Sequence, residues 1–381
     1  MNKPISQSLY EPTVIDIFSG VGGLSLGAAR AGFTVKAAIE NDKHAVEAHS
    51  TNFPHSIHLE KDISKLNSTE ILATIGMKKG ELDGIIGGPP CQGFSAIGHQ
   101  KRNDPRNKLF VHFFQIVSEV RPKFFLAENV PGIMTSAGEE IRQKAMSLVE
   151  GDYCILPPII LTASDFGAPT TRKRVFFIGY LQNEMKGLNE SDFHAPGRID
   201  RITVRKALKG LPLSIDPNWQ SSDDSWRKVA LPGSCDFSKR LWGHVPKGVG
   251  NTETIIKLKN EQLASGSFGT RHSERVAARY AKVLPGKSDT VSKSRKLELD
   301  GFCPTLRAGT GPERGSYQAV RPLHPTENRV ITPREAARLQ GFPDWFQFSP
   351  TKWHSFRQIG NSVSPILAEK IFKLIFNALK N

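Results

Sequence analysis

Short apolar segments alternate with helix-like segments through the first 180 residues, and this alternation constrains the fold more than any other feature of the chain. The apolar segments are rich in β-branched and aromatic residues and are bounded by turn residues, a pattern typical of strands. They cover residues 13–18, 34–39, 83–86, 123–127 and 175–180. Helical patterns lie between them at 24–31, 43–52 and 109–120. This alternation predicts an α/β fold, with a doubly wound, mostly parallel sheet covered by helices on both faces.

The alternation fades near residue 185, which divides the chain into parts. We predict a catalytic and cofactor-binding domain at residues 1–185 and a smaller, loop-rich domain at residues 186–325. One clear helix is expected in the second domain, at residues 272–283. Residues 326–381 regain regular patterns and are predicted to return to the first domain, with an amphipathic helix at 365–379.

Helix-start residues mark the beginning of the last part. Thr332 has the N-cap position, Pro333 the first helical position, and Glu335 follows three residues after the cap. This arrangement predicts a capping box, in which the threonine and glutamate side chains bind each other's backbone N–H groups.

The positive charge of the chain is concentrated in one segment. The net charge is +14, from 51 Lys+Arg against 37 Asp+Glu, and residues 186–325 hold 24 Lys+Arg against 14 Asp+Glu. A basic domain favours a polyanion as partner, because cations near phosphates release condensed counterions. No run of 18 apolar residues occurs, so we expect no membrane span. Cys91, Cys154, Cys235 and Cys303 lack zinc-ligand spacing, so we expect no metal site and a reducing, cytoplasmic location.

A glycine-rich turn follows the first predicted strand. Asp16 begins the segment, and Gly20, Gly22 and Gly23 precede the first predicted helix. Glycines let the backbone approach a ligand closely, and a helix N-terminus offers free N–H groups. The third glycine of the dinucleotide fingerprint is absent, while Glu40 closes the second strand, where a carboxylate commonly binds ribose hydroxyls. These features favour an adenosine-containing cofactor without a pyrophosphate, although similar turns also occur where nothing binds.

Cys91 lies in a glycine- and proline-rich loop after the apolar run 84–86. Pro89 and Pro90 stiffen the backbone before the thiol, and this position at a strand's carboxyl end is where ligands bind in a doubly wound sheet. Most lone cysteines are small buried hydrophobic residues. The Pro-Pro-Cys setting instead favours a nucleophile, followed by a polar loop at 99–108 that could close over a phosphate chain.

Three further charged residues stand at predicted strand ends. Glu128 follows the apolar run 124–127, where a carboxylate could bind or protonate a ring nitrogen. Arg172 and Arg174 alternate before the strand at 175–180 and could hold a carbonyl oxygen and a phosphate. The alternatives are a helix-capping acid for Glu128 and an ordinary solvated face for the arginines.

Taken together, these motifs resemble the cytosine-5 DNA methyltransferase family, in that family's usual order and through nearly the whole chain. Residues 18–23 resemble its cofactor loop, 89–92 its nucleophile motif, 128–130 its acid motif, and 334–343 the helix that supports its target-recognition domain. The glycine-asparagine-serine-valine run at 360–363 resembles its last motif.

Three further parts of the chain bear on the resemblance. Residues 303–307 resemble the family's short threonine–leucine element. Thr170 stands where the family usually has glutamine, a departure that concerns local hydrogen bonding. Residues 186–325 correspond to the DNA-reading, target-recognition domain, and the implied fold is that of S-adenosylmethionine-dependent methyltransferases.

The resemblance implies a function and its site. A methyl group is expected to pass from S-adenosyl-L-methionine to carbon 5 of a flipped cytosine in a specific double-stranded DNA sequence, through a covalent Cys91 adduct at carbon 6. The implied catalytic residues are Cys91, Glu128, Arg172 and Arg174. The implied cofactor-binding residues are Asp16, Phe18, Gly20, Gly22, Gly23, Glu40, Asp62, Ile63, Pro89, Asn361, Ser362 and Val363.

The compact length further resembles bacterial restriction-modification enzymes. Our default expectation is a monomer, located in the cytoplasm and on the nucleoid through DNA, with a cognate restriction endonuclease as functional companion. Three alternatives stay open: an RNA (tRNA) cytosine-5 methyltransferase, a non-catalytic DNA-binding protein that kept the fold, and a flavin or nicotinamide oxidoreductase.

Overall fold

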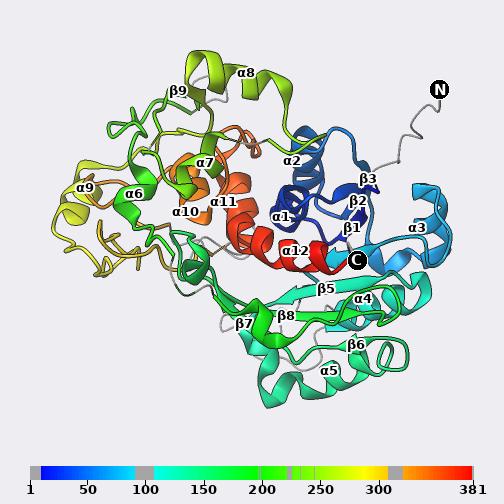
Figure 1. Cartoon of the computed structure of the whole chain (residues 1–381). Helices are drawn as coiled ribbons and strands as arrows, with labels where there is room; N and C mark the ends of the chain where they lie inside the picture. The colour runs from blue at the N-terminus through cyan, green and yellow to red at the C-terminus, as the bar shows by residue number, and fades with distance from the viewer. Residues whose placement is uncertain are drawn as a thin grey trace, which may run out of the picture.

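A computed structural model of the chain describes residues 10–90, 107–195, 197, 199–220, 225–231, 233–243, 245–307 and 321–379. A mostly parallel sheet lies at its centre and helices cover both faces, as Figure 1 shows. The strands of this sheet are β1 (Thr13–Ile17), β2 (Thr34–Glu40), β3 (Ile57–Glu60), β4 (Gly84–Gly87), β5 (Phe124–Asn129), β6 (Cys154–Ile155), β7 (Ile159–Thr162) and β8 (Lys173–Tyr180). The predicted fold class is confirmed.

The strand order is β3-β2-β1-β4-β5-β8-β6, with β7 also paired to β8. Strands β1 to β5 run parallel, whereas β8 is antiparallel to β5, β6 and β7. The chain moves outward from β1 to β3 on one side and then returns to build β4 and β5 on the other. The order therefore reverses between β1 and β4, the place where doubly wound sheets bind ligands.

The twelve helices of the described chain account for most of the remaining regular structure. They are α1 (Gly23–Ala31), α2 (Lys43–Asn52), α3 (Ser68–Ile75), α4 (Asn107–Val120), α5 (Glu139–Met146), α6 (Val204–Leu208), α7 (Asp236–Trp242), α8 (Thr252–Glu261), α9 (Glu274–Ala281), α10 (Pro333–Gln340), α11 (Lys352–Asn361) and α12 (Pro365–Leu379). None of them is long and apolar enough to cross a membrane.

Two apolar layers enclose the sheet. On one face Phe33 contacts Phe372 and Phe376 of α12, which lies against α1. A methyl group on Gly27 of α1 would lie 2.3 Å from Ala368 Cβ, so the two helices touch backbone to backbone. On the other face α4 packs its phenylalanines against β5, with Phe114 and Phe125 in edge contact. Residues 365–379 thus complete a layer begun near the N-terminus.

The prediction of one helix in residues 186–325 was wrong, because α6, α7 and α8 also form there. Helix α8 begins at an Asn251 cap and ends at Gln262 in a left-handed conformation, and its charged side chains obscure the apolar period. A second small sheet pairs β9 (Arg227–Lys228) with β10 (Leu263–Ala264). Such short helices and strands carry too few residues to show a clear period.

Helix α10 joins residues 186–325 to the rest of the fold. The Thr332–Glu335 capping box is present as predicted, with both reciprocal hydrogen bonds formed. Arg334 donates to the carbonyls of Ser265, Pro343 and Phe346, and Arg338 binds the Asp344 carboxylate through two nitrogens. We call this arrangement the α10 joint. It carries its positive charges in the interior, where each is hydrogen-bonded.

Candidate functional site

The glycine turn lies at the carboxyl end of β1, beside β2. The N–H groups of Phe18 and Ser19 both donate to the carbonyl of Ile39, and Gly20 N–H donates to Glu40 Oε2 at 3.0 Å. Glu40 Oε1 accepts from Asn41 and Asp42 N–H at 2.8 and 3.0 Å. Burial raises the pKa of the Glu40 carboxyl, opposed by these hydrogen bonds. The predicted glycine turn and Glu40 therefore form one hydrogen-bonded unit.

Gly22 and Gly23 allow contacts that a side chain would prevent. Gly22 has φ 99°, a left-handed conformation, and a Cβ there would lie 2.6 Å from the Phe53 ring. A Cβ on Gly23 would lie 2.5 Å from the carbonyl oxygen of Val363. The last motif, at Asn361–Val363, is thus packed against the first, 340 residues earlier in the chain.

A buried polar chain runs beneath the turn, and it was not predicted. The Ser25 hydroxyl donates to Asp16 Oδ2 at 2.6 Å, His49 Nε2 lies 3.0 Å from the same hydroxyl, and His49 Nδ1 lies 2.9 Å from His58 Nε2. Because the serine proton points to Asp16, His49 Nε2 must carry a proton, and His58 then donates to His49 Nδ1. Burial raises the pKa of Asp16 to about 7 and lowers those of both histidines. Asp16 Oδ1 is buried without a hydrogen-bond partner among the described residues.

Asp62 and Ile63 follow β3, next to Glu40 on the neighbouring strand. Residues Glu40 and Glu60 are paired in the register of β2 and β3, so Asp62 lies at the same sheet edge. Its exposed carboxylate accepts from Ser64 N–H and hydroxyl at 3.0 and 2.8 Å, which lowers the pKa of Asp62. The Ile63 side chain is buried. The site residues predicted on β1, β2 and β3 therefore share one edge.

The second group of predicted residues lies at the ends of β4, β5 and β8. Glu128 and Asn129 are the last two residues of β5, and Glu128 pairs with Phe176 in the register with β8. Arg174 Nε lies 2.5 Å from Glu128 Oε1, and both side chains are nearly buried. Burial lowers the pKa of Arg174, while the charge of Glu128 raises it. A nearly buried carboxylate and a nearly buried guanidinium thus form an ion pair at one strand end.

The segment before Cys91 is held close to this ion pair. Asn129 Nδ2 donates to the Pro89 carbonyl at 3.0 Å, and the Cβ position of Gly88 is 2.9 Å from Glu128 Oε2. Any side chain at residue 88 would therefore contact the Glu128 carboxylate. Cys91 itself, and residues 99–106 of the loop predicted at 99–108, lie outside the described residues. The last two residues of that prediction are not loop, because helix α4 begins at Asn107.

Arg172 has different partners from those of Arg174. Its Nη1 donates to the Leu306 carbonyl at 3.2 Å and its Nη2 to the Asn361 carbonyl at 3.1 Å. The side chain is fully buried, and burial lowers its pKa well below the usual value. Thr170 forms a parallel bridge with Cys303, so the predicted threonine–leucine element lies against this strand. Arg172 thus connects that element to the last motif.

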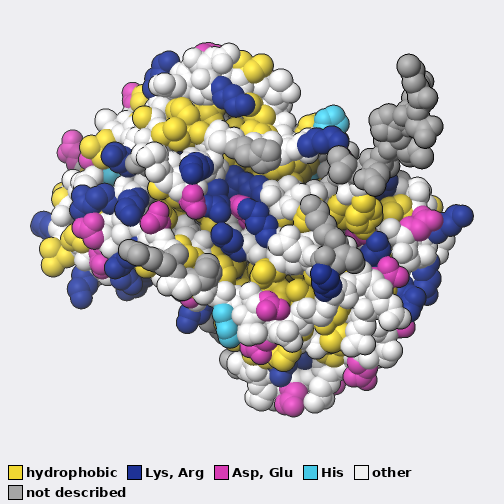
Figure 2. Space-filling model, viewed as in Figure 1, with side chains coloured by type: hydrophobic (Ala, Val, Ile, Leu, Met, Phe, Trp, Pro, Cys, Tyr) yellow, Lys and Arg dark blue, Asp and Glu magenta, His cyan; other side chains and the backbone are white. Residues whose placement is uncertain are grey.

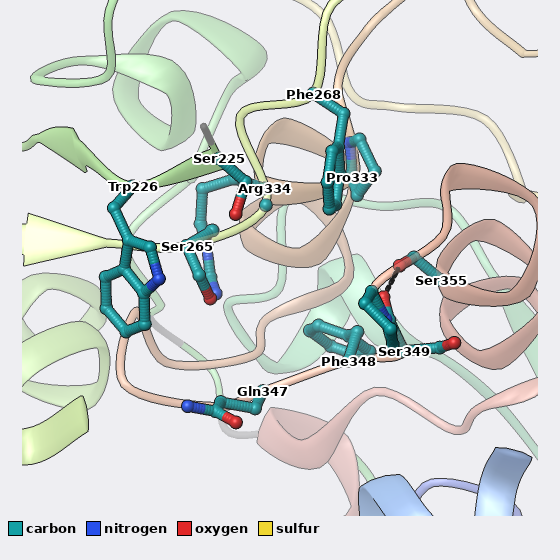
Figure 3. Close-up of a pocket in the computed structure, with 12 residues that line it drawn as sticks. Ser225, Trp226, Ser265, Phe268, Pro333, Arg334, Gln347, Phe348, Ser349 and Ser355 are labelled. Carbon is teal, nitrogen blue, oxygen red and sulfur yellow. Dashed lines mark hydrogen bonds between the residues drawn. The ribbon is translucent and has the colours of Figure 1, made fainter. Parts of the chain in front are cut away.

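A cavity of about 220 Å³ opens between the α10 joint and residues 225–268, away from the residues predicted above. Its wall includes Trp226, Ser265 and Phe268 on one side and Gln347 and Ser349 on the other (Figure 3). Lys and Arg side chains gather around the middle of the visible face in Figure 2. None of the residues that line the cavity belongs to the predicted catalytic or cofactor-binding residues.

The sheet order, the glycine turn with its acidic partner, and the paired motifs at the carboxyl ends of β4 and β5 define an S-adenosylmethionine-dependent methyltransferase fold. The solved structure of S. pombe Dnmt2 methyltransferase shares this fold, with a TM-score of 0.61 at 18% identity, and covers 98% of this chain and 100% of that chain. A profile of the C-5 cytosine-specific DNA methylases matches residues 12–377. The chain belongs to this family and is a DNA (cytosine-5-)-methyltransferase.

Individual relatives are similar over nearly their whole length. The type II methyltransferase M.XorII of Xanthomonas oryzae pv. oryzae is 38% identical, over 98% of this chain and 86% of its own. M.DdeI of Desulfomicrobium norvegicum is 32% identical, over 95% of this chain and 88% of its own. A crystal structure of a DNA modification methyltransferase encoded within an E. coli prophage has a TM-score of 0.88 at 53% identity, and covers 97% of this chain and 100% of that chain.

Proposed function

We propose that the chain methylates carbon 5 of a flipped cytosine in a specific duplex DNA sequence, with Cys91 as covalent nucleophile and S-adenosyl-L-methionine as cofactor. The observation that carries the proposal is the buried Glu128–Arg174 pair, which lies against Gly88 three residues before Cys91. An acid and a guanidinium lie together beside Gly88, and the proposal adds the thiol of Cys91, three residues further along the chain. Addition to a pyrimidine ring needs this set, because the ring must be polarised as sulfur attacks.

The residues at the β1–β3 edge fit the cofactor. Phe18, Asp62 and Ile63 would hold the adenine and Glu40 the ribose. The remaining cofactor positions would surround the methionine part; they are Asp16, Gly20, Gly22, Gly23, Pro89, Asn361, Ser362 and Val363. Two buried oxygens without partners among the described residues, Asp16 Oδ1 and Ser19 Oγ, support a polar ligand here, and the Cβ position of Gly20 meets only open space. When bound, S-adenosylmethionine supplies the methyl group that carbon 5 receives.

The chain's own residues do the remaining chemistry. The Cys91 thiolate forms a bond to carbon 6, and the displaced ring electrons make carbon 5 electron-rich. Glu128 stabilises the proton on ring nitrogen 3 and binds the exocyclic amine, while Arg174 holds the ring carbonyl oxygen. After carbon 5 is methylated, its proton leaves to a base and the carbon–sulfur bond breaks, which restores the ring and the thiolate. Arg172 positions Asn361 and Leu306 through their carbonyls.

The substrate and the setting follow from the basic segment and the relatives. The target cytosine must leave the duplex stack, at a cost of roughly a few kcal/mol. Residues 186–325 would read the DNA sequence, and their positive charge favours the phosphate backbone. The names of two relatives support a type II modification enzyme. A monomer in the cytoplasm, with a restriction endonuclease as companion, remains part of the proposal.

Two experiments test the covalent step. Cys91→Ala should abolish methyl transfer to unmethylated duplex DNA while S-adenosylmethionine binding, measured by calorimetry, stays close to that of the unchanged protein. Duplex DNA with 5-fluorocytosine at the target should trap a covalent adduct, because fluorine cannot leave as a proton does. Full activity of the alanine variant would refute the covalent step. Methyl transfer to tRNA but not to duplex DNA would show that the substrate is RNA and not DNA.

Glu128→Gln separates acid catalysis from structure. The amide keeps a hydrogen-bonding oxygen for Arg174 but loses the charge, so we expect a kcat lower by roughly 10²–10⁴-fold. Single-turnover methyl transfer measures it. Unchanged kcat would remove Glu128 from the mechanism.

A further inference from the structure

We call residues 186–325 the recognition segment. Three cations lie together where this segment meets the start of helix α11, and we name Arg271, Arg321 and Lys352 the basic seam. Lys352 Nζ donates to the Gly269 carbonyl, and also to Gln220 Oε1 at 3.1 Å. Arg271 Nη2 donates to Asn218 Oδ1 at 3.0 Å. The Arg321 guanidinium lies over the Phe356 ring, 4.5 Å from its centroid. Each cation is thus held in place by a neutral group.

No carboxylate compensates the basic seam: within the described part of the chain, none of its three members forms an ion pair. Neighbouring cations are different, because Arg329 is paired with Glu335 and Arg279 with Asp289. Burial lowers the pKa of Lys352, and so do the charges of Arg321 and Arg271. The charges of Arg321 and Arg271 therefore disfavour the charged form of Lys352, and a bound anion would offset this effect.

The basic seam lies between the recognition segment and helix α11. Gly269 and Asn218 belong to the recognition segment, whereas Lys352 and Phe356 belong to α11. This helix ends at Asn361, whose carbonyl binds Arg172. Phe268, Ser349 and Ser355, which line the cavity in Figure 3, are close in sequence to the residues that hold Lys352 and Arg321. An anion held at the seam would therefore fasten the recognition segment to the helix that leads to the cofactor edge.

We propose that the basic seam binds backbone phosphates of duplex DNA and so ties DNA docking to the position of α11. Guanidinium and ammonium groups bind phosphate well, and the guanidinium of arginine can donate two parallel hydrogen bonds to two phosphate oxygens. The inference rests on the proposed DNA substrate. It goes beyond that proposal in assigning phosphate contacts to three residues that lie outside the predicted site.

The test is the salt dependence of DNA binding. Affinity for sheared, unmethylated duplex DNA is measured by fluorescence anisotropy over about 50–200 mM salt. Arg321→Gln and Lys352→Gln should each flatten the slope of log affinity against log salt by about one, and weaken binding roughly tenfold near 0.1 M salt. Arg321→Lys keeps the charge and should restore most of the slope. Lys144→Gln, on the exposed surface of α5, removes the same charge elsewhere and should leave the slope unchanged.

Several outcomes decide the proposal. The proposal is supported if Lys352→Gln has a raised KM for DNA but an unchanged kcat and an unchanged affinity for S-adenosylmethionine. The two unchanged values also show that the variant is folded. Slopes equal to that of the unchanged protein would overturn the inference. A second outcome would also overturn it: inorganic phosphate or poly-glutamate stabilises the unchanged protein less when Arg321 or Lys352 is replaced, but the salt slope of DNA binding stays the same. The seam would then bind an anion other than DNA. If the unchanged protein neither bound nor methylated duplex DNA, the proposed function would fail as well; methylation with unaltered slopes would refute the seam alone.

Discussion

The α10 joint and the basic seam both connect the recognition segment to the sheet, and both do so with arginines, yet they treat charge in opposite ways. In the joint, Arg338 is fully buried and binds Asp344 and three backbone carbonyls. In the seam, Arg321 lies on an aromatic ring and Lys352 binds neutral oxygens. Internal pairing is typical of a permanent connection, whereas uncompensated cations are typical of a surface that receives an anion.

The largest effect is expected at the joint. Arg338→Met leaves the Asp344 carboxylate buried without its cationic partner, so we expect the free energy of unfolding to fall by about 3–5 kcal/mol. Urea denaturation followed by circular dichroism measures it. Arg205→Gln breaks the exposed Arg205–Asp300 pair and serves as the control, because an ion pair screened by solvent should contribute little to stability. Equal losses in the two variants would contradict the structural role of the joint.

A pH dependence is expected from His324, which lies next to Glu335 at the joint. Burial lowers its pKa from 6.5 to about 4, and its Nδ1 accepts from Thr326 and Glu327 N–H. Because the unfolded chain binds the proton first, the stability from neutral His324 is present above about pH 6.5 and is lost as the pH falls toward about 4. His324→Asn keeps an acceptor oxygen but cannot titrate. Denaturation at pH 5 and 7.5 should show a smaller difference in this variant, and an unaltered difference would exclude His324 as its source.

The capping box of α10 should contribute less to the free energy of unfolding than the buried arginines of this helix. Thr332→Ala removes the acceptor for the Glu335 N–H, and we expect a loss of about 1 kcal/mol in unfolding free energy. Thr332→Ser retains the hydroxyl and should recover most of that loss. If alanine and serine were equivalent, the capping hydrogen bond would have no measurable role.

The smallest effect on stability belongs to the seam. Lys352→Gln removes a cation that has no carboxylate partner among the described residues, so the free energy of unfolding should change by less than about 0.5 kcal/mol or rise slightly. Thermal unfolding without DNA measures this. A large loss would mean that Lys352 is a structural residue like Arg338, and the contrast between the two regions would disappear.

Local signals made the first layers predictable from sequence. Helix α2 was predicted with its observed bounds because the Asp42 cap and the Phe53-Pro54 end are both local. The glycine turn and Glu40 could be predicted because the residues that form this unit lie within 25 positions of one another in the sequence. The prediction for β5 ended too early, since Glu128 and Asn129 continue the strand by pairing with β8.

Long-range contacts were not predictable. Asn129 reaches Pro89, 40 positions away, and Arg172 reaches Asn361, 189 positions away. The buried His49 and the half-buried His58 gave no sequence signal, since a histidine in an amphipathic helix and another in a short strand are ordinary residues. The basic seam brings together side chains up to 81 positions apart, and only the folded structure shows that no carboxylate among the described residues pairs with them.

The contact between α12 and α1 has a consequence for synthesis. Phe33 and the small residues of α1 gain their cover only when residues 365–379 have left the ribosome and folded. Until then the nascent sheet exposes an apolar face, and the Asn361–Val363 segment that packs on Gly23 does not yet exist. A ribosome that stalls before this helix should therefore release a product that aggregates or is degraded, and methyl transfer should begin only after the helix has been made.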